Sequence, residues 1–207
     1  MKVYDVSAAI YEGMTVYKNK TEKQPKIEIT QDFTSGNVRE SRVHLDVHTG
    51  THVDAPLHMM PNGAAIESIM IEDLVGSCIV FDLTYVEDRI KVEHLEALGI
   101  QAGDFLFFKT KNSLMEEFDF DFIYLSEEAA RYLAEIGVRG VGIDSLGVER
   151  SQPNHLTHKA LFSKSVIIIE GLRLREVEAG IYYMVAAPLK LTGTDAAPAR
   201  VLLIEQK

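Results

Sequence analysis

The sequence predicts an α/β domain with a mixed β-sheet and few helices, and three observations lead to this class. Short runs rich in β-branched and aromatic residues recur along the chain, whereas segments with a helical pattern are few. Several of these runs are apolar throughout, which is typical of strands covered on both faces. The chain shows neither a strict alternation of strand and helix nor a glycine-rich loop after a strand, which excludes a Rossmann pattern.

The expected strands follow from alternation or from continuous apolar character. Alternation with period two is clearest around Val43, where apolar side chains face one way and His44, Asp46 and His48 face the other. The strands predicted in this way cover residues 3–7, 27–30, 42–48, 78–83, 105–110, 140–144, 166–170, 182–188 and 200–205. Because no linker or repeat divides the chain, we expect one domain over residues 1–207.

Helices are predicted where capping signals flank a helical pattern. One covers residues 92–98 and is closed by Gly99. A second covers residues 127–136, with Ser126 as its N-cap and Gly137 after its end. Two shorter helices are considered, one over residues 66–74 and one after an Asn154 cap.

Composition excludes several classes of function. The formal net charge is −10, from 21 Lys and Arg against 31 Asp and Glu, and no basic block is present. Binding to nucleic acid or to an anionic membrane surface is therefore not expected. A single cysteine, Cys78, permits no internal disulfide, and with no signal-peptide pattern at the N-terminus we expect a cytoplasmic protein. Cys78 lies in an apolar run and is interpreted as a buried small side chain.

Histidines are concentrated in two windows, and the first reads H-T-G-T-H-V-D-A-P-L-H from His48 to His58. Gly50 and the proline make one continuous helix unfavourable, so a turn followed by extended chain is expected. In extended chain His52 and Asp54 project to the same side, and a turn would return His48 beside them. Two imidazoles and a carboxylate suit Zn²⁺, Mn²⁺ or Fe²⁺, although a structural hydrogen-bonded cluster is the alternative.

His58 lies beyond the proline bend and is interpreted as a proton-transferring group beside the metal, with a structural histidine as the alternative. The second window holds His155 and His158, followed by Glu170 at the end of an apolar strand. A carboxylate there needs a partner, and a cation would supply one. Asp54 and Glu170 are therefore candidates to bridge two ions, with a histidine of the second window as a further ligand.

These residues resemble the H-x-G-T/A-H-x-D-x-P-x-H signature of the cyclase-like metal-dependent hydrolases, the family of bacterial kynurenine formamidase and isatin hydrolase. The resemblance extends to three further segments: Tyr4-Asp5-Val6-Ser7, the stretch from His158 through Glu170 to Leu172, and Ala187-Pro188-Leu189-Lys190 with Gly193. It implies a compact mixed-sheet domain of the swivelling β/β/α type with a few flanking helices. It also implies a homodimer or homotetramer.

Carried over to this sequence, the resemblance implies a role for each residue of the two windows. His48, His52 and Asp54 would bind one zinc ion. Asp54 and Glu170 would bridge to a second ion that His158, rather than His155, also binds. Zinc is the expected metal, two ions per subunit, and Mn²⁺ suits the same ligands. His58 would be the general acid/base that acts with a metal-activated water.

The aromatic-P-G-D turn found near the N-terminus of many family members is replaced here by Tyr17-Lys18-Asn19-Lys20, and the chain has no tryptophan. Tyr17 is the expected aromatic contact to the substrate, with an ordinary surface aromatic as the alternative. The function that the resemblance implies is hydrolysis of a small amide, most like an arylformamidase that converts N-formylkynurenine to kynurenine and formate.

Three alternatives stay open from the sequence. The first is hydrolysis of a cyclic amide or lactone. The second is a non-haem iron oxygenase with His52, Asp54 and His158 as its triad, which leaves His48, His58 and Glu170 without roles. The third is a metal-binding protein without catalytic activity.

Overall fold

The computed structural model describes residues 1–205 and confirms the predicted α/β class with a mixed sheet. In this range, seven strands close into a barrel. In order around the barrel they are β4 (His52–Asp54), β12 (Ala196–Glu205), β11 (Gly180–Pro188), β5 (Val75–Asp82), β7 (Phe105–Lys109), β9 (Gly140–Ile143) and β10 (Ile167–Glu170). A further strand, β1 (Val3–Asp5), pairs with the C-terminal half of β12. The N-terminal half of β12 pairs with β4 and so closes the barrel.

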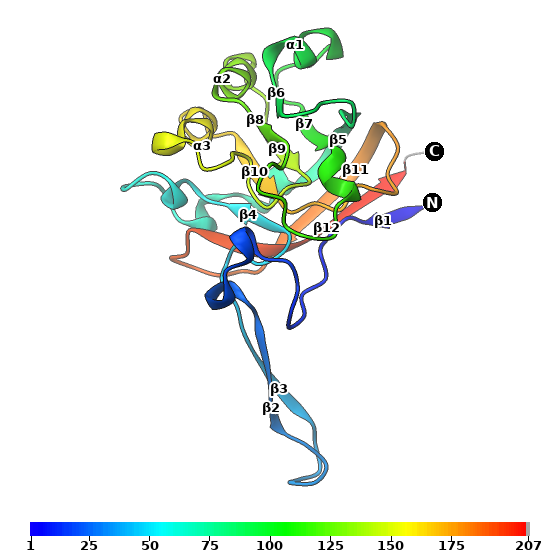
Figure 1. Ribbon diagram of the computed structural model, residues 1–207, viewed down its shortest axis with the longest axis vertical. Helices are drawn as coiled ribbons and strands as arrows, with labels where there is room; N and C mark the ends of the chain where they lie inside the picture. Colours follow the sequence, from blue (N-terminus) through cyan, green and yellow to red (C-terminus); the bar gives the residue numbers. More distant parts are fainter. Residues whose placement is uncertain (206–207) are drawn as a thin grey trace.

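The strands β5, β7, β9 and β10 run parallel, and the chain between them forms helices that cover one side of the barrel (Figure 1). These helices are α1 (Val92–Leu95), α2 (Glu127–Ile136) and α3 (Leu156–Phe162). Two short strands, β6 (Arg89–Ile90) and β8 (Tyr124–Leu125), pair beside them. Within residues 1–205 no helix combines the length and the apolar character that a bilayer crossing requires.

Side-chain alternation along the parallel strands builds two hydrophobic clusters. On β7, Phe105 and Phe107 pack with side chains of the other barrel strands. Leu106 and Phe108 point the opposite way and pack with residues of α2 and α3, such as Leu133. All four β7 side chains are fully buried, which explains why the strand is apolar throughout.

A long hairpin of β2 (Lys26–Gln31) and β3 (Glu40–His44) extends away from the barrel (Figure 1). The predicted strand over residues 42–48 is too long, because β3 ends at His44. His44 pairs with Lys26, and the residue before Lys26 is Pro25, which has no N–H for the next hydrogen bond of the ladder. The hairpin pairs with no other strand of the described chain.

The helix α2 has the predicted bounds, and the other helical predictions need correction. The predicted helix over 92–98 is α1 followed by a 3-10 helix that ends at Gly99. Residues 66–74 form two separate 3-10 helices. Asn154 does not cap α3, since it has φ 66 within a preceding 3-10 helix. The carboxylate of Glu149 instead accepts hydrogen bonds from the first N–H groups of α3.

Candidate metal centre

Strand register places three of the predicted site residues on one face of the barrel. In the antiparallel pair of β4 with β10, Glu170 lies opposite His52, and Asp54 lies two residues further along β4. Because side chains alternate along a strand, all three project to the same side. Val53 points the other way into the barrel core. The face that carries the three polar side chains is the one that α3 covers, since Ile168 packs with the helix cluster.

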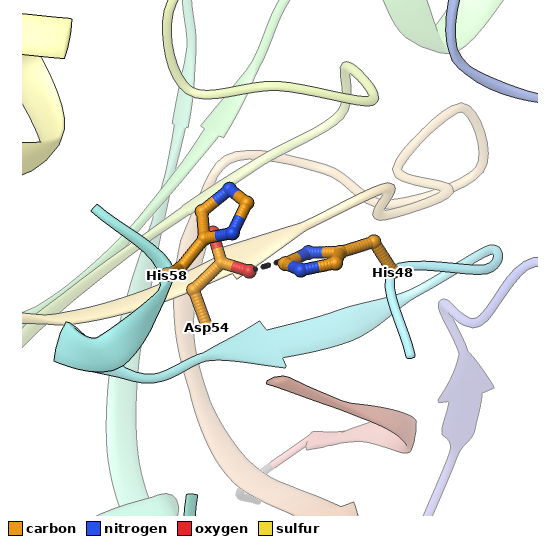
Figure 2. A group of neighbouring side chains, drawn as sticks. All are labelled: His48, Asp54 and His58. Carbon is orange, nitrogen blue, oxygen red and sulfur yellow. Dashed lines mark ion pairs between the residues drawn. The ribbon is translucent and has the colours of Figure 1, made fainter. Parts of the chain in front are cut away.

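The remaining histidines reach this face from three separate segments. His48 precedes the tight turn at Gly50, which has φ 66, and so returns beside β4. His58 ends the 3-10 helix Pro56–His58, whose start follows the bend at Pro56. His158 comes from the first turn of α3 and is buried. Figure 2 shows His48 and His58 on either side of Asp54.

Four of the predicted histidines lie around the carboxylates of Asp54 and Glu170. One oxygen of Asp54 lies 2.9 Å from His48 Nδ1 and 3.3 Å from His52 Nε2. Its other oxygen lies 3.5 Å from His158 Nε2. Glu170 lies 3.4 Å from His52 Nε2 and 3.3 Å from His158 Nε2. Each carboxylate therefore contacts two or more imidazoles.

Several of these buried atoms lie at ion-pair distance from their neighbours but make no well-aligned hydrogen bond among the described residues. They include both oxygens of Asp54, Nε2 of His52 and both ring nitrogens of His158. Buried polar atoms without well-aligned hydrogen bonds are unfavourable, and a bound cation would supply the interaction that they lack. Imidazole nitrogens and carboxylate oxygens are the ligands that Zn²⁺ and Mn²⁺ take in proteins. The donor set therefore fits a divalent cation.

The second nitrogen of each candidate ligand histidine lies beside an acceptor. His52 Nδ1 donates to the carbonyl of Gly50 over 3.0 Å. His48 Nε2 lies 2.8 Å from Asp195 Oδ2, and His158 Nδ1 lies 3.3 Å from Glu149 Oε2. Such partners select the tautomer that leaves the other nitrogen free for a metal ion.

The imidazoles and carboxylates of the cluster shift one another's pKa values so that the charged forms are favoured. Burial opposes the charged form of His52, but Asp54 and Glu170 outweigh it and raise the pKa of His52 to about 10. Burial raises the pKa of the Glu170 carboxyl, as does Asp54, and the imidazoles of His158 and His52 outweigh both and lower it to about 2. His58 differs, since burial lowers the pKa of its imidazole and keeps it neutral at pH 7.

The two histidines of the second window have different surroundings. His158 faces the two carboxylates, whereas His155 contacts Glu149 through Nδ1 and its side chain is 48% exposed. Of the pair, the geometry therefore favours His158 as a ligand. Two histidines lie outside the cluster: His44 faces Glu28 on the hairpin, and His94 accepts a hydrogen bond from the N–H of Lys91.

A pocket of about 250 Å³ opens from the cluster. Its buried end includes His58, His158 and Glu170, and its outer wall includes Tyr17. The Tyr17 hydroxyl lies 2.9 Å from Ser151 Oγ, and its ring packs edge-on against Phe118 with the ring centres 5.4 Å apart. Tyr17 is therefore fixed in the wall of the pocket.

Two residues of the site were not predicted from the sequence. Asp195 contacts both His48 and His58, at 2.8 and 3.2 Å. Glu149 contacts both histidines of the second window. Glu149 could have been suspected from its position shortly before that window. Asp195 carries no local signal, because the pairing of β12 with β4 brings it to His48 across 147 residues of sequence.

Comparisons with known proteins agree with this geometry. A family model described as "Putative cyclase" matches residues 4–150. The chain is 30% identical to a kynurenine formamidase of Salinibacter ruber over 98% of this chain and 97% of that protein. Among solved structures it is similar to a "predicted metal-dependent hydrolase" from Bacillus stearothermophilus, with 63% identity, a TM-score of 0.90 and coverage of 98% and 97% of the two chains.

The fold also recurs in isatin hydrolase A from Labrenzia aggregata, at 22% identity and a TM-score of 0.84, over 99% and 94% of the two chains. The barrel, the histidine signature on its covered face and the match over residues 4–150 agree with one another. The chain belongs to the cyclase family.

Proposed function

We propose that the protein is a metal-dependent hydrolase of a small non-peptide amide, most like an arylformamidase that releases formate from N-formylkynurenine. The observation that carries the proposal is the buried set of imidazole and carboxylate atoms without well-aligned hydrogen bonds, which lies beside the pocket that His158 and Glu170 line. The kynurenine formamidase of Salinibacter ruber, which is similar over almost its whole length, supports the same reaction class.

We infer that two zinc ions bind, and the same ligands would accept Mn²⁺. His48, His52 and Asp54 would hold the first ion, and Asp54, Glu170 and His158 would hold the second. The short contacts of Asp54 and Glu170 with the imidazoles support this division. When bound, such a cation supplies a Lewis acid that makes a water nucleophilic near pH 7 and polarises a carbonyl group.

His58 is assigned the proton transfers. Its Nδ1 lies 3.2 Å from Asp195, so a proton held there leaves Nε2 as the basic atom. The lowered pKa of the imidazole keeps it neutral and ready to accept a proton from the attacking water. The resulting imidazolium then returns the proton to the leaving nitrogen. The alternative is that His58 is itself a metal ligand, because its ring nitrogen lies close enough to a ring nitrogen of His48 and a carboxylate oxygen of Asp54 for the three to share one ion.

Tyr17 is assigned a role in substrate binding. Its ring forms part of the pocket wall, and its hydroxyl is already held by Ser151, so the ring face is the surface that it offers. An aromatic amide can stack on such a face. Tyr17→Leu should raise KM for an aryl formamide more than it lowers kcat.

The test of the reaction is formate release by metal-loaded protein from N-formylkynurenine and simple aryl formamides, with isatin ring opening followed in parallel. We expect hydrolysis of the formamides, and its loss on chelation. His58→Ala should retain the metal and lose most of the turnover, whereas Asp54→Asn should lose the metal. Loss of metal from His58→Ala would make His58 a ligand. Failure of fully loaded protein to hydrolyse any of these compounds would contradict the proposed function.

We infer that the chain assembles with copies of itself, as a homodimer or homotetramer, and the β2–β3 hairpin supports this. One face of the hairpin carries Ile27, Ile29 and Val43, each at least 41% exposed, while the opposite face pairs Glu28 with Arg42. An isolated two-stranded hairpin is marginally stable, so this apolar face needs a cover. A second copy of the chain is the one partner present wherever the chain is.

Light scattering on the purified protein tests the assembly. The wild type should have at least twice the monomer mass, and Ile27→Lys with Ile29→Lys should shift it towards the monomer. A monomeric wild type would contradict the inference.

A cytoplasmic location is proposed on the cysteine chemistry. Cys78 is 1% exposed, and burial raises the pKa of its thiol to about 12. Such a thiol is inert towards disulfide exchange. Because Cys78 is the single cysteine, the fold depends on no internal disulfide, which is usual for proteins of the reducing cytosol.

A further inference from the structure

The pocket that leaves the metal centre ends at a lysine-bearing loop. Residues 17–23 form two consecutive 3-10 helices, Tyr17–Asn19 and Thr21–Lys23. Lys18, Lys20 and Lys23 of this loop line the same pocket as His58 and Glu170. One cavity therefore joins the candidate metal centre to a cationic end, and a molecule that spans the cavity contacts both.

The three lysines differ in how their charge is neutralised. Lys23 pairs with Asp46 at 3.0 Å, and Lys20 lies 3.8 Å from Glu22. Lys18 has no carboxylate within 4.0 Å of its ammonium group anywhere in residues 1–205, although its side chain is half-buried. Its ammonium group lies 5.2 Å from the centre of the Tyr17 ring.

The loop holds Lys18 in a defined and unfavourable backbone conformation. Lys18 and Asn19 have φ of 58 and 51, in the left-handed region that residues other than glycine rarely adopt. The N–H of Asn19 donates to the carbonyl of Val16 over 2.9 Å, and the neighbouring Tyr17 is fixed by Ser151. Residues held in such conformations are concentrated at ligand sites, because the surrounding structure must stabilise them.

The charge of this loop is opposite to that of the whole chain. The protein has a formal charge of −10, yet three lysines occur between residues 18 and 23 and all line one pocket. Lys18 has no carboxylate partner within residues 1–205, so a ligand carboxylate in the pocket can supply the negative charge through a charge-assisted hydrogen bond. In a pocket of about 250 Å³ with an aromatic wall, that ligand is a small molecule.

We propose that the substrate is an anionic aromatic amide, with a carboxylate that pairs with Lys18 while its ring lies against Tyr17. The inference rests on the proposed function, since it names the substrate class of the same site. Lys18 acts as a specificity residue: it selects among amides by charge and takes no part in the bond cleavage at the far end of the pocket. Lys20, whose own partner is 3.8 Å away, adds to the positive potential.

The experiment compares charged and uncharged versions of one substrate. Metal-loaded protein is assayed with 2-, 3- and 4-formamidobenzoate and with the three corresponding methyl esters. At least one acid should be hydrolysed with a kcat/KM about tenfold above that of its ester, the size expected of a hydrogen-bonded ion pair in a partly buried site. In Lys18→Gln this acid-to-ester ratio should fall towards one, and Lys18→Arg should restore it.

Lys164→Gln is the matched control, because it removes the same charge outside the pocket lining. It should keep the wild-type ratio. Acids that are no better than their esters for all three isomers, or an unchanged ratio in Lys18→Gln, would overturn the inference while ester hydrolysis still upheld the proposed function.

A binding measurement tests the anion site at Lys18 independently of the proposed hydrolysis. The three aminobenzoates, which are the acid products, are titrated calorimetrically into metal-loaded protein. The tightest of them should bind about tenfold more weakly to Lys18→Gln and unchanged to Lys164→Gln. If no formamide is hydrolysed but this difference is found, the hydrolytic proposal is wrong and the anion site is right. Equal binding to both variants overturns the anion site.

Discussion

At the scale of single residues, the chemistry of the centre depends on which nitrogen of each histidine faces the carboxylates. Asp195 has a special place in this arrangement, since one oxygen lies near both His48 Nε2 and His58 Nδ1. It therefore orients a candidate ligand and the candidate proton carrier together. Partners of this kind are commonly worth about 10–100-fold in activity or metal affinity.

Asp195→Asn tests this positioning role. The amide has the shape of the carboxylate but no charge, and only its oxygen can accept a proton from an imidazole. We expect kcat to fall about tenfold or more with the metal content retained, and Asp195→Glu to recover part of the loss. Asp73→Asn, a change at an exposed carboxylate away from the pocket, should have wild-type turnover. Full activity in Asp195→Asn would contradict the role.

Protonation of His52 leads to a second prediction at this scale. Its raised pKa of about 10 means that the metal-free protein carries a proton there at pH 7, whereas a metal ligand must be neutral. Metal binding at pH 7 should therefore release protons, and apparent affinity should rise as the pH increases from 7 towards 10. Calorimetric titration of the metal in two buffers of different ionisation enthalpy counts these protons, and equal heats in the two buffers would contradict the assignment.

The same pKa shifts set the stability of the metal-free protein. The raised pKa of His52 contributes stability that is complete below pH 6.5 and is lost as the pH rises through about 10. The lowered pKa of Glu170 contributes stability that is complete above pH 4.5 and is lost as the pH falls through about 2. These two contributions are fully present together only between pH 4.5 and 6.5.

At the scale of elements, two glycines allow the site segments to meet. Gly50 and Gly171 have φ of 66 and 72, and they follow His48 and Glu170 closely in sequence. A Cβ atom on Gly171 would overlap the carbonyl group of Gly50. The Thr51 hydroxyl also donates to the carbonyl of Gly171 over 2.6 Å, which joins the turn before β4 to the end of β10.

Gly171→Ala should therefore be strongly destabilising. Left-handed backbone costs an alanine about 1–2 kcal/mol, and steric overlap adds about 1–3 kcal/mol. Gly99→Ala is the matched control, since Gly99 has φ 67 and open space around it, so only the backbone cost of about 1–2 kcal/mol is expected. Urea unfolding of the three proteins measures both values. Equal losses in the two variants would show that the contact with Gly50 is unimportant.

Elements with local signals were predictable from sequence, and those set by distant partners were not. The helix α2 matches its prediction because Ser126, the acidic first turn and Gly137 all lie within the segment. The strand around His44 was predicted too long, since its end depends on Pro25 in the partner strand. The hairpin alternates like a half-buried strand although no other strand of residues 1–205 pairs with it, so its extension from the barrel could not be predicted from its own sequence.

At the scale of the whole molecule, barrel closure assembles the centre from both ends of the chain. The pairing of β12 with β4 carries Asp195 to the histidines of the first window, and β10 carries Glu170 to His52. Sequence spacing and the family resemblance together identified six side chains that the structure brings together, because each window is locally dense in ligand-type residues. They could not identify Asp195 or the pocket lysines as parts of the same site, since only the closed fold relates them.

The most direct test of the proposed two-metal centre is the rate of formate release from an aryl formamide, measured as zinc is added stepwise to metal-free protein. We expect a negligible rate without metal, a rise with each equivalent bound, and a plateau at two equivalents per chain. A rate that does not depend on zinc, or fully loaded protein without activity, would contradict the proposed centre.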